Sequence, residues 1–426
     1  MKRVVILCVW LFSVVAGHAQ LSLDECRRLA RENYPEIRQY DLVHQTEQYN
    51  LSNAARAWIP QIAFSAQATW QTDAPNFPKE LTGMLAQQGL EIPGLRKDQY
   101  KVALELNQTI WDGGKSVADK RIARAEAAEQ KTMTDVDLYE LEGRVDDLYF
   151  GILLLDERIA QTNLTLNLLR SNLEKVRALQ RNGVAMQSDA DVLEAELLSV
   201  GQQLIQFESS CDSYRRMLGI FIGQKVGDRK LQRPSAVQPL SGESARPELA
   251  MFAAKIDRLT AQEKMVKSSS MPRLGFFAQG YYGYPGLDYM QSMMNSDWSW
   301  NAMFGVKLSW NFGAYYTQKN NLNKLRTSRQ QVEVQRDVFL FNMNLQAAQE
   351  NGDIARLRKA IADDDRIVAL RRSVREAAES KLRNGIIDTH DLLSKITDES
   401  TASMARSMRE IELLKAIYEY KHTINR

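Results

Sequence analysis

Two aspartates with equivalent places in the chain are the side chains best placed to do chemistry. Residues 181–183 (RNG) recur as residues 383–385, and Asp189 and Asp391 each follow the glycine by six residues. A carboxylate in the first turn of a helix is favoured by the helix dipole. Where symmetry-related copies meet on an axis, the same carboxylate forms a ring that favours cations in a pore. Both roles remain open at this point.

Other polar residues do not form a reactive group. His44, His390 and His422 are far apart and lack the spacing of metal ligands. The sequence has no phosphate-binding loop, no nucleophile elbow and no Cys–His pair typical of catalysis. We therefore expect a protein that is not an enzyme, with no catalytic residue, no metal site and no cofactor. The 55 Lys+Arg and 53 Asp+Glu are interspersed, so no nucleic-acid partner is expected.

The N-terminal residues 1–19 have the pattern of a secretory signal peptide. A basic pair at 2–3 precedes an apolar run over 4–15, and small residues follow at 16–19. The run is too short to span a bilayer as a helix. The alternative is an uncleaved anchor. No cysteine would begin the mature chain, so a lipid anchor is not expected.

Two cysteines, Cys26 and Cys211, remain after the signal. A disulfide is possible in an exported protein. However, Cys211 falls on an apolar heptad seam, which favours a buried free thiol.

Long helices and two-faced strands alternate along the chain. Ser22 is a plausible N-cap for the first helix, Asn-Gly pairs end the long helices, and Ser188 is a plausible N-cap for the first return helix. Apolar residues step by three and four from Leu138 to Ile159, which predicts a coiled-coil seam in a helix about 100 Å long. The predicted elements of the first half are a helix over 22–58, strands over 61–71 and 99–107 around a loop, a helix over 115–181, and a return helix ending near Gly219. Those of the second half are a helix over 248–270, strands over 273–284 and 298–311 around a loop, a helix over 314–383, and a final helix from 388.

This order predicts an internal two-fold repeat. Residues 20–222 form the first copy, 223–247 a linker and 248–426 the second copy. The acidic run 363–365, above the second turn, is expected to lie on a solvated face.

Each strand has an apolar face and a polar face, a length and pattern typical of transmembrane barrel strands. A soluble sandwich with one buried face is the alternative. Four strands cannot close a barrel, and open edges are not tolerated in lipid, so the barrel must be shared between chains. The side chains expected to face lipid are Phe64, Leu104, Phe276 and Phe304. Those expected to face the lumen are Gln67, Glu105, Gln279 and Lys307.

Short motifs in this order resemble the TolC-like outer membrane factor (outer membrane efflux protein) family. Besides the two Asn-Gly turns, they are residues 21–25 (LSLDE), 59–62 (IPQI), 111–114 (WDGG), 246–249 (RPEL) and 271–274 (MPRL). The resemblance implies a mainly α fold with membrane β-strands. In it, a long coiled-coil α-helical barrel in the periplasm continues into a shared outer-membrane β-barrel with four strands per chain. It also implies a homotrimer that serves as exit duct for a tripartite efflux pump or type I secretion system, with a periplasmic adaptor and an inner-membrane pump as partners.

The same resemblance assigns the helix-turn-helix tips to adaptor contact. The residues carried over are Gly183, Val184, Ala185 and Ser188, then Gly385, Ile386, Ile387 and Thr389. It also assigns Asp189 and Asp391 to the pore constriction. Some family members have a tyrosine and an arginine where this chain has Leu382 and Ile387, so a hydrophobic closure is the alternative to a polar latch. The rival function is a pore-less periplasmic coiled-coil scaffold or adaptor, which leaves the two-faced strands without a role.

Overall fold

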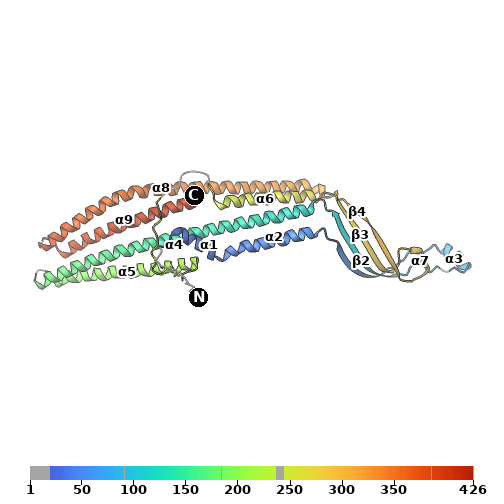
Figure 1. The fold of residues 1–426 in the computed structure, drawn as a ribbon, viewed down its shortest axis with the longest axis horizontal. Coiled ribbons are helices and arrows are strands. Elements are labelled where there is room, and N and C mark those ends of the chain that lie inside the picture. Colours follow the sequence, from blue (N-terminus) through green and yellow to red (C-terminus); the bar gives the residue numbers. More distant parts are fainter. Residues whose placement is uncertain (1–19, 91, 184, 237–243, 385, 426) are drawn as a thin grey trace, which may run out of the picture. The chain divides into compact units, whose positions relative to one another are not determined.

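Long helices and one antiparallel sheet make up this chain (Figure 1). The structure is a computed structural model that describes residues 20–90, 92–183, 185–236, 244–384 and 386–425. The signal peptide predicted over 1–19 lies outside these residues. The elements of the first half are α1 (Leu23–Asn33), a 3-10 helix η1 (Pro35–Arg38), α2 (Gln39–Arg56), β1 (Gln61–Trp70), α3 (Lys79–Gln87), β2 (Asp98–Trp111), α4 (Lys115–Arg181) and α5 (Gln187–Ile222). Those of the second half are α6 (Pro247–Ser268), β3 (Arg273–Tyr284), α7 (Tyr289–Met294), β4 (Ser299–Ser309), α8 (Ala314–Arg383) and α9 (Thr389–Ile424).

Contacts divide the chain into two compact units. The helical unit contains the residues up to Tyr40, Thr132–Ala250, and those from Arg336 onward. The strand unit contains Asp41–Lys131 and Met251–Gln335. Each unit draws on both halves of the sequence, so this division differs from the predicted division into two repeats and a linker, which remains a prediction.

The first predicted helix is wrong as a single element. It is broken after α1, and η1 separates α1 from α2. Pro35 has no N–H, and it keeps Tyr34 in an extended conformation, with φ −67° and ψ 127°. The predicted cap at Ser22 is confirmed, because the Glu25 N–H donates to its Oγ at 3.2 Å.

The four strands form one sheet in the order β1-β2-β3-β4, and all pairs are antiparallel. β2 is longer at both ends than predicted. The two segments predicted as loops contain the short helices α3 and α7, so these predictions are wrong in part. Asp288 caps α7 by accepting the Gln291 N–H at 2.9 Å. Such short helices carry too few residues for a periodic signal.

The register of the sheet places the predicted sets of side chains on separate faces. Phe64 is paired with Leu104, and Glu105 is paired with Gln279. Phe64 and Phe304 are 72% and 78% exposed, which is unusual for phenylalanine. On the other face, Lys101 donates to Gln279 at 3.1 Å, and Gln279 donates to Glu105. The division into an apolar and a polar face is confirmed, and their contact with lipid and lumen remains a prediction.

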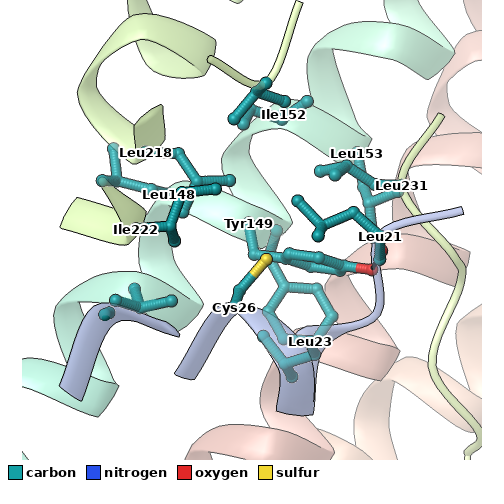
Figure 2. Close-up of a cluster of buried hydrophobic side chains, with 14 of the residues drawn as sticks. Leu21, Leu23, Cys26, Leu148, Tyr149, Ile152, Leu153, Leu218, Ile222 and Leu231 are labelled. Carbon is teal, nitrogen blue, oxygen red and sulfur yellow. Dashed lines mark hydrogen bonds between the residues drawn. The ribbon is translucent and has the colours of Figure 1, made fainter. Parts of the chain in front are cut away.

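The largest core of the helical unit gathers the start of the chain, α4, α5 and the segment after α5 (Figure 2). Leu21 pairs with Leu231 in an isolated β-bridge. The hydroxyl of Tyr149, on α4, lies 2.8 Å from the Leu21 carbonyl oxygen and 2.5 Å from that of Gln232. α5 continues past the end predicted at Gly219 to Ile222, and its C-cap Gly223 has a φ of 70°, the left-handed conformation that commonly ends a helix.

Cys26 and Cys211 are both buried in this core as free thiols, which confirms the expectation for Cys211. Burial raises the pKa of Cys26 to about 12, and it also raises the pKa of Cys211. A protonated, buried thiol is a poor nucleophile. We expect less than about a tenth of either thiol to react with a maleimide at neutral pH in folded protein, and both to react fully in denaturant. Mass spectrometry of the labelled chain measures this, and rapid labelling of folded protein would contradict the burial.

Candidate functional site: the two helix-turn-helix tips

The first tip is the turn between α4 and α5, in the helical unit. Gly183 has φ +74°, a conformation that other residues rarely adopt, and the space around its missing side chain is open. Its N–H donates to the Gln180 carbonyl at 2.9 Å. Val184, predicted to contact the adaptor, lies outside the described residues. Met186 is 74% exposed, so the described part of the tip presents apolar surface to solvent.

The second tip joins α8 to α9. The Ile386 N–H donates to the Lys381 carbonyl at 3.0 Å, and this bond closes the end of α8. Ile386 is 68% exposed. Gly385 lies outside the described residues. Thr389 is buried, so its hydroxyl does not reach the surface of this chain.

The two aspartates have different local roles despite their equivalent places. Asp189 caps α5, because its Oδ2 accepts the Met186 N–H at 2.8 Å. The predicted N-cap at Ser188 is therefore wrong: α5 begins at Gln187, with Met186, two residues before Ser188, as the capping residue. At the second tip Asp388 performs the capping and accepts the N–H of Asp391 at 2.8 Å. The Asp391 side chain lies exposed on the surface of the chain.

One hydrophobic cluster lies behind both tips. Its buried members come from α4, α5, α8 and α9, and they include Leu173, Leu193, Ala378 and Leu392. Ala185, Leu382 and Ile387 pack against this cluster. The residues considered for a hydrophobic closure thus contact the chain's own core, and the two hairpins are held together just above their turns.

A network of charges crosses between the hairpins beside this cluster. Arg375 on α8 forms ion pairs with Glu379 on the same helix and Glu399 on α9. Lys175 on α4 reaches Glu379 at 3.5 Å. Burial alone would lower the pKa of Arg375, but hydrogen bonds to the two carboxylates raise it. The sequence analysis missed these residues. Of these ion pairs, only Arg375–Glu379, four residues apart on one helix, could have been recognised from the sequence.

The acidic run 363–365 is also engaged within the chain. Asp364 is 6% exposed and pairs with Arg409 on α9, and Asp365 accepts from Arg406 at 2.8 Å. The predicted solvated face is therefore wrong for Asp364. Periodicity placed these residues on a helix but did not show which partner helix faced them.

The described residues contain no group of three or more His, Cys, Asp or Glu side chains able to hold a metal ion. Within the same residues, no helix is sufficiently long and apolar to cross a membrane.

This arrangement, a sheet with an exposed apolar face and coiled-coil hairpins that end in glycine turns, is the fold of several solved outer-membrane proteins. VceC from Vibrio cholerae has a TM-score of 0.67 at 14% identity, covering 94% of this chain and 95% of that one. The open state of MtrE from Neisseria gonorrhoeae gives 0.66 at 13% identity, with 94% and 88% covered. CmeC from Campylobacter jejuni gives 0.65 at 14% identity, with 94% and 85% covered.

The family model described as outer membrane efflux protein matches residues 27–223. This match and the shared fold confirm the predicted resemblance to the outer membrane efflux proteins. VceC is an outer membrane protein, and CmeC and MtrE are outer membrane channels. A comparison with curated protein sequences gives no match. The matched family and these structural neighbours are efflux and channel proteins, not enzymes.

Proposed function

We propose that three copies of this chain form an exit duct that spans the outer membrane and is gated at the helix-turn-helix tips. The observation that carries the proposal is the four-stranded sheet, in which β1 and β4 are unpaired edges and one face is apolar and exposed. Unpaired backbone groups are not tolerated in lipid, so the edges must pair with other copies. Three copies supply twelve strands, above the minimum of eight seen in membrane barrels.

The helices continue the duct in the periplasm. In this proposal the α4–α5 and α8–α9 hairpins of three chains form a helical barrel, and the tips contact a periplasmic adaptor. The exposed Met186 and Ile386 suit such a contact, because exposed apolar side chains at a turn tip otherwise cost solubility. The adaptor connects the duct to an inner-membrane pump, in a tripartite efflux pump or a type I secretion system.

Two measurements on detergent-extracted protein test this function. Native mass spectrometry should give three chains, and the same sample in a planar bilayer should give discrete conductance steps. A stable monomer, or a trimer without conductance under conditions that open the tips, would contradict the proposal. A scaffold without a pore would leave the membrane fraction without detergent.

In this proposal Asp391 forms the pore constriction, and Asp189, whose side chain caps α5, supplies a second carboxylate. Three exposed carboxylates around an axis favour cations. Asp391→Asn should lower the cation-to-anion permeability ratio of the open channel at least two-fold, since each copy loses one charge. Asp363→Asn, which removes an exposed charge higher on α8, is the control and should change the ratio less. Reversal potentials in a salt gradient measure both. An unchanged ratio in Asp391→Asn removes this residue from the constriction.

Adaptor contact at the first tip is tested by Gly183→Trp. The space around Gly183 is open, so the indole projects outward and obstructs a docking partner instead of disturbing the core. The left-handed backbone adds a local strain of about 1 kcal/mol. We expect the trimer to survive and the adaptor to stop co-purifying with it. The matched control is Gly83→Trp in α3, where the space is equally open. Undiminished co-purification in Gly183→Trp would remove the first tip from the contact.

A further inference from the structure

The polar face of the sheet carries more positive than negative charge. Side chains alternate between the two faces of a strand, so the register of the four strands assigns every charged residue to one face. The polar face has three basic residues, Lys101, Arg273 and Lys307, and one acidic residue, Glu105. Its net charge is therefore +2 in each chain.

The acidic residue of this face is already connected to one of the basic residues. Lys101 donates a hydrogen bond to Oε1 of Gln279 at 3.1 Å, and Nε2 of Gln279 donates to Glu105. One positive and one negative charge are thus joined through a single amide. The surplus of positive charge therefore belongs to Arg273 and Lys307.

Arg273 and Lys307 are neighbours at the end of the sheet where β3 begins and β4 ends. Arg273 is paired with Ser309, and Lys307 is paired with Gly275. The two basic residues are therefore diagonal neighbours on adjacent strands, a relation that places Cα atoms about 7–8 Å apart. Both are exposed, and within the described part of the chain neither forms an ion pair. Like charges at this distance repel each other, and an anion bound between them would remove the repulsion.

The two basic side chains line a hollow of about 390 Å³ in the strand unit. Phe277, on the same polar face, also lines the hollow, and it is paired with Gly305 on β4. A Cβ at residue 305 would lie 3.1 Å from a ring carbon of Phe277, so the missing side chain lets the ring lie over β4. The amide side chains of Gln61 and Asn107 complete this part of the lining. The hollow thus combines two cations, two amide groups and an aromatic ring.

Two carboxylates also line the hollow, and both are engaged by other groups. Asp112 accepts the backbone N–H of Gly114 at 2.9 Å and that of Ser116 at 2.6 Å. Asp119 forms an ion pair with Lys115 at 2.7 Å. These carboxylates therefore do not neutralise the two basic residues on the polar face of the sheet.

We propose that this hollow binds aromatic anions, which are solutes that carry a carboxylate, sulfonate or phosphate group on an aromatic body. The planar guanidinium of Arg273 matches the paired oxygens of such a group, and Lys307 adds a second positive charge. The aromatic body stacks on or packs edge-on against Phe277. Neither the charges nor the ring alone selects this class of ligand, because the two cations select the anion and the ring selects the aromatic body.

The role of the hollow in transport rests on the proposed function. In the proposed trimer the polar face lines the duct, so three hollows form a basic ring around the lumen. Rings of arginine and lysine favour anions in a pore. The ring therefore identifies aromatic anions as a class of solute that the duct conducts. The same chemistry could recognise the phosphate of a lipid headgroup, but the hollow lies on the polar face, opposite the exposed apolar face that carries Phe64 and Phe304.

Calorimetry on the full-length, detergent-extracted protein tests binding, because the hollow lies within one chain. The probe is 2-naphthalenesulfonate, and we expect one bound molecule per chain. The variant with both Arg273→Gln and Lys307→Gln should bind it at least ten times more weakly, since hydrogen bonds to charged groups are lost. Phe277→Leu keeps the charges and should weaken binding about three-fold. Lys101→Gln is the matched control, because it removes the same charge from the same face and should change the affinity less than about two-fold. The cation 2-naphthylmethylammonium should not bind.

Recordings in a planar bilayer then show where the hollow lies. In the parent channel the sulfonate should block the current, and in the Arg273→Gln, Lys307→Gln variant the block should need at least ten times more probe. Binding in detergent without any block assigns the hollow to an anionic lipid headgroup and overturns the proposal. Equal binding of the sulfonate by parent and double variant, or equal binding of the anionic and cationic probes, also overturns it. A monomer without conductance contradicts the proposed function, while calorimetry still decides whether the hollow binds anions.

Discussion

Replacing Phe64 by arginine should prevent the protein from assembling in the outer membrane. Phe64 is 72% exposed on the apolar face of β1, opposite Leu104. Arginine facing lipid near the middle of the bilayer costs about 2–4 kcal/mol, and a trimer carries that cost three times. The expected result is loss of most of the detergent-extractable trimer, measured as trimer yield from purified outer membranes. Phe304→Arg, on the same face, should have a similar effect.

Gln67→Arg provides the matched control, because it lies on β1 three residues away but on the opposite, polar face. Gln67 pairs with Lys101, so the added charge has a cationic neighbour and its cost is electrostatic, about 1 kcal/mol or less in a hydrated lumen. Trimer yield should stay within about two-fold of the parent protein. Equal loss at both positions would show that the polar face is not hydrated, and loss at Gln67 alone would reverse the assignment of faces.

Removing Arg375 should loosen the second tip. Its side chain is 14% exposed, and those of its partners Glu379 and Glu399 are 19% and 12% exposed. Breaking a fully buried pair costs about 3–5 kcal/mol because a charge is left uncompensated. The partial exposure reduces our expectation to about 2–3 kcal/mol for Arg375→Met. Hydrogen exchange should rise at the end of α8 and the start of α9, with the rest of the helical unit unchanged.

Arg371→Met is the control that shows whether the effect of Arg375→Met comes from the burial of its ion pairs or from the loss of any positive charge on α8. Arg371 lies one turn away on α8 and pairs with Asp398, but the two side chains are 47% and 37% exposed. Exposed pairs contribute about 0–1 kcal/mol, so exchange should barely change. If Arg371→Met and Arg375→Met give the same exchange pattern, the ion pairs of Arg375 do not stabilise the second tip more than an exposed ion pair does.

Periodicity predicted the regular elements well because each long element repeats its pattern many times. The seam from Leu138 to Ile159 predicted α4, and alternation predicted all four strands. The errors occur where one residue outweighs the pattern. Pro35 breaks the first helix although the apolar positions continue past it. α3 and α7 are too short to show a periodic pattern. At the start of α5, the N-cap rule selected Ser188, whereas the capping residue is Met186 and the side chain of Asp189 accepts its N–H.

The tip region was predictable in position but not in its contacts. The two glycine turns and the following aspartates are visible as a sequence repeat. The repeat gave Asp189 and Asp391 the same environment, yet only Asp189 serves as a cap, because the second tip has Asp388 at the capping place. Long-range pairs such as Lys175–Glu379 join helices about 200 residues apart, and no local pattern reports which helices face each other.

The pairing of β2 with β3 constrains when the sheet can form during biogenesis. β1 and β2 are near each other in the chain, whereas Lys101 on β2 pairs with Gly283 on β3. About 180 residues, including all of α4, α5 and α6, separate these strands. Such non-local pairing is slow, and until it forms each hairpin leaves a strand edge open to aggregation. The β1–β2 hairpin is therefore synthesised well before its partner β3, and the edge of β2 stays unpaired over that interval.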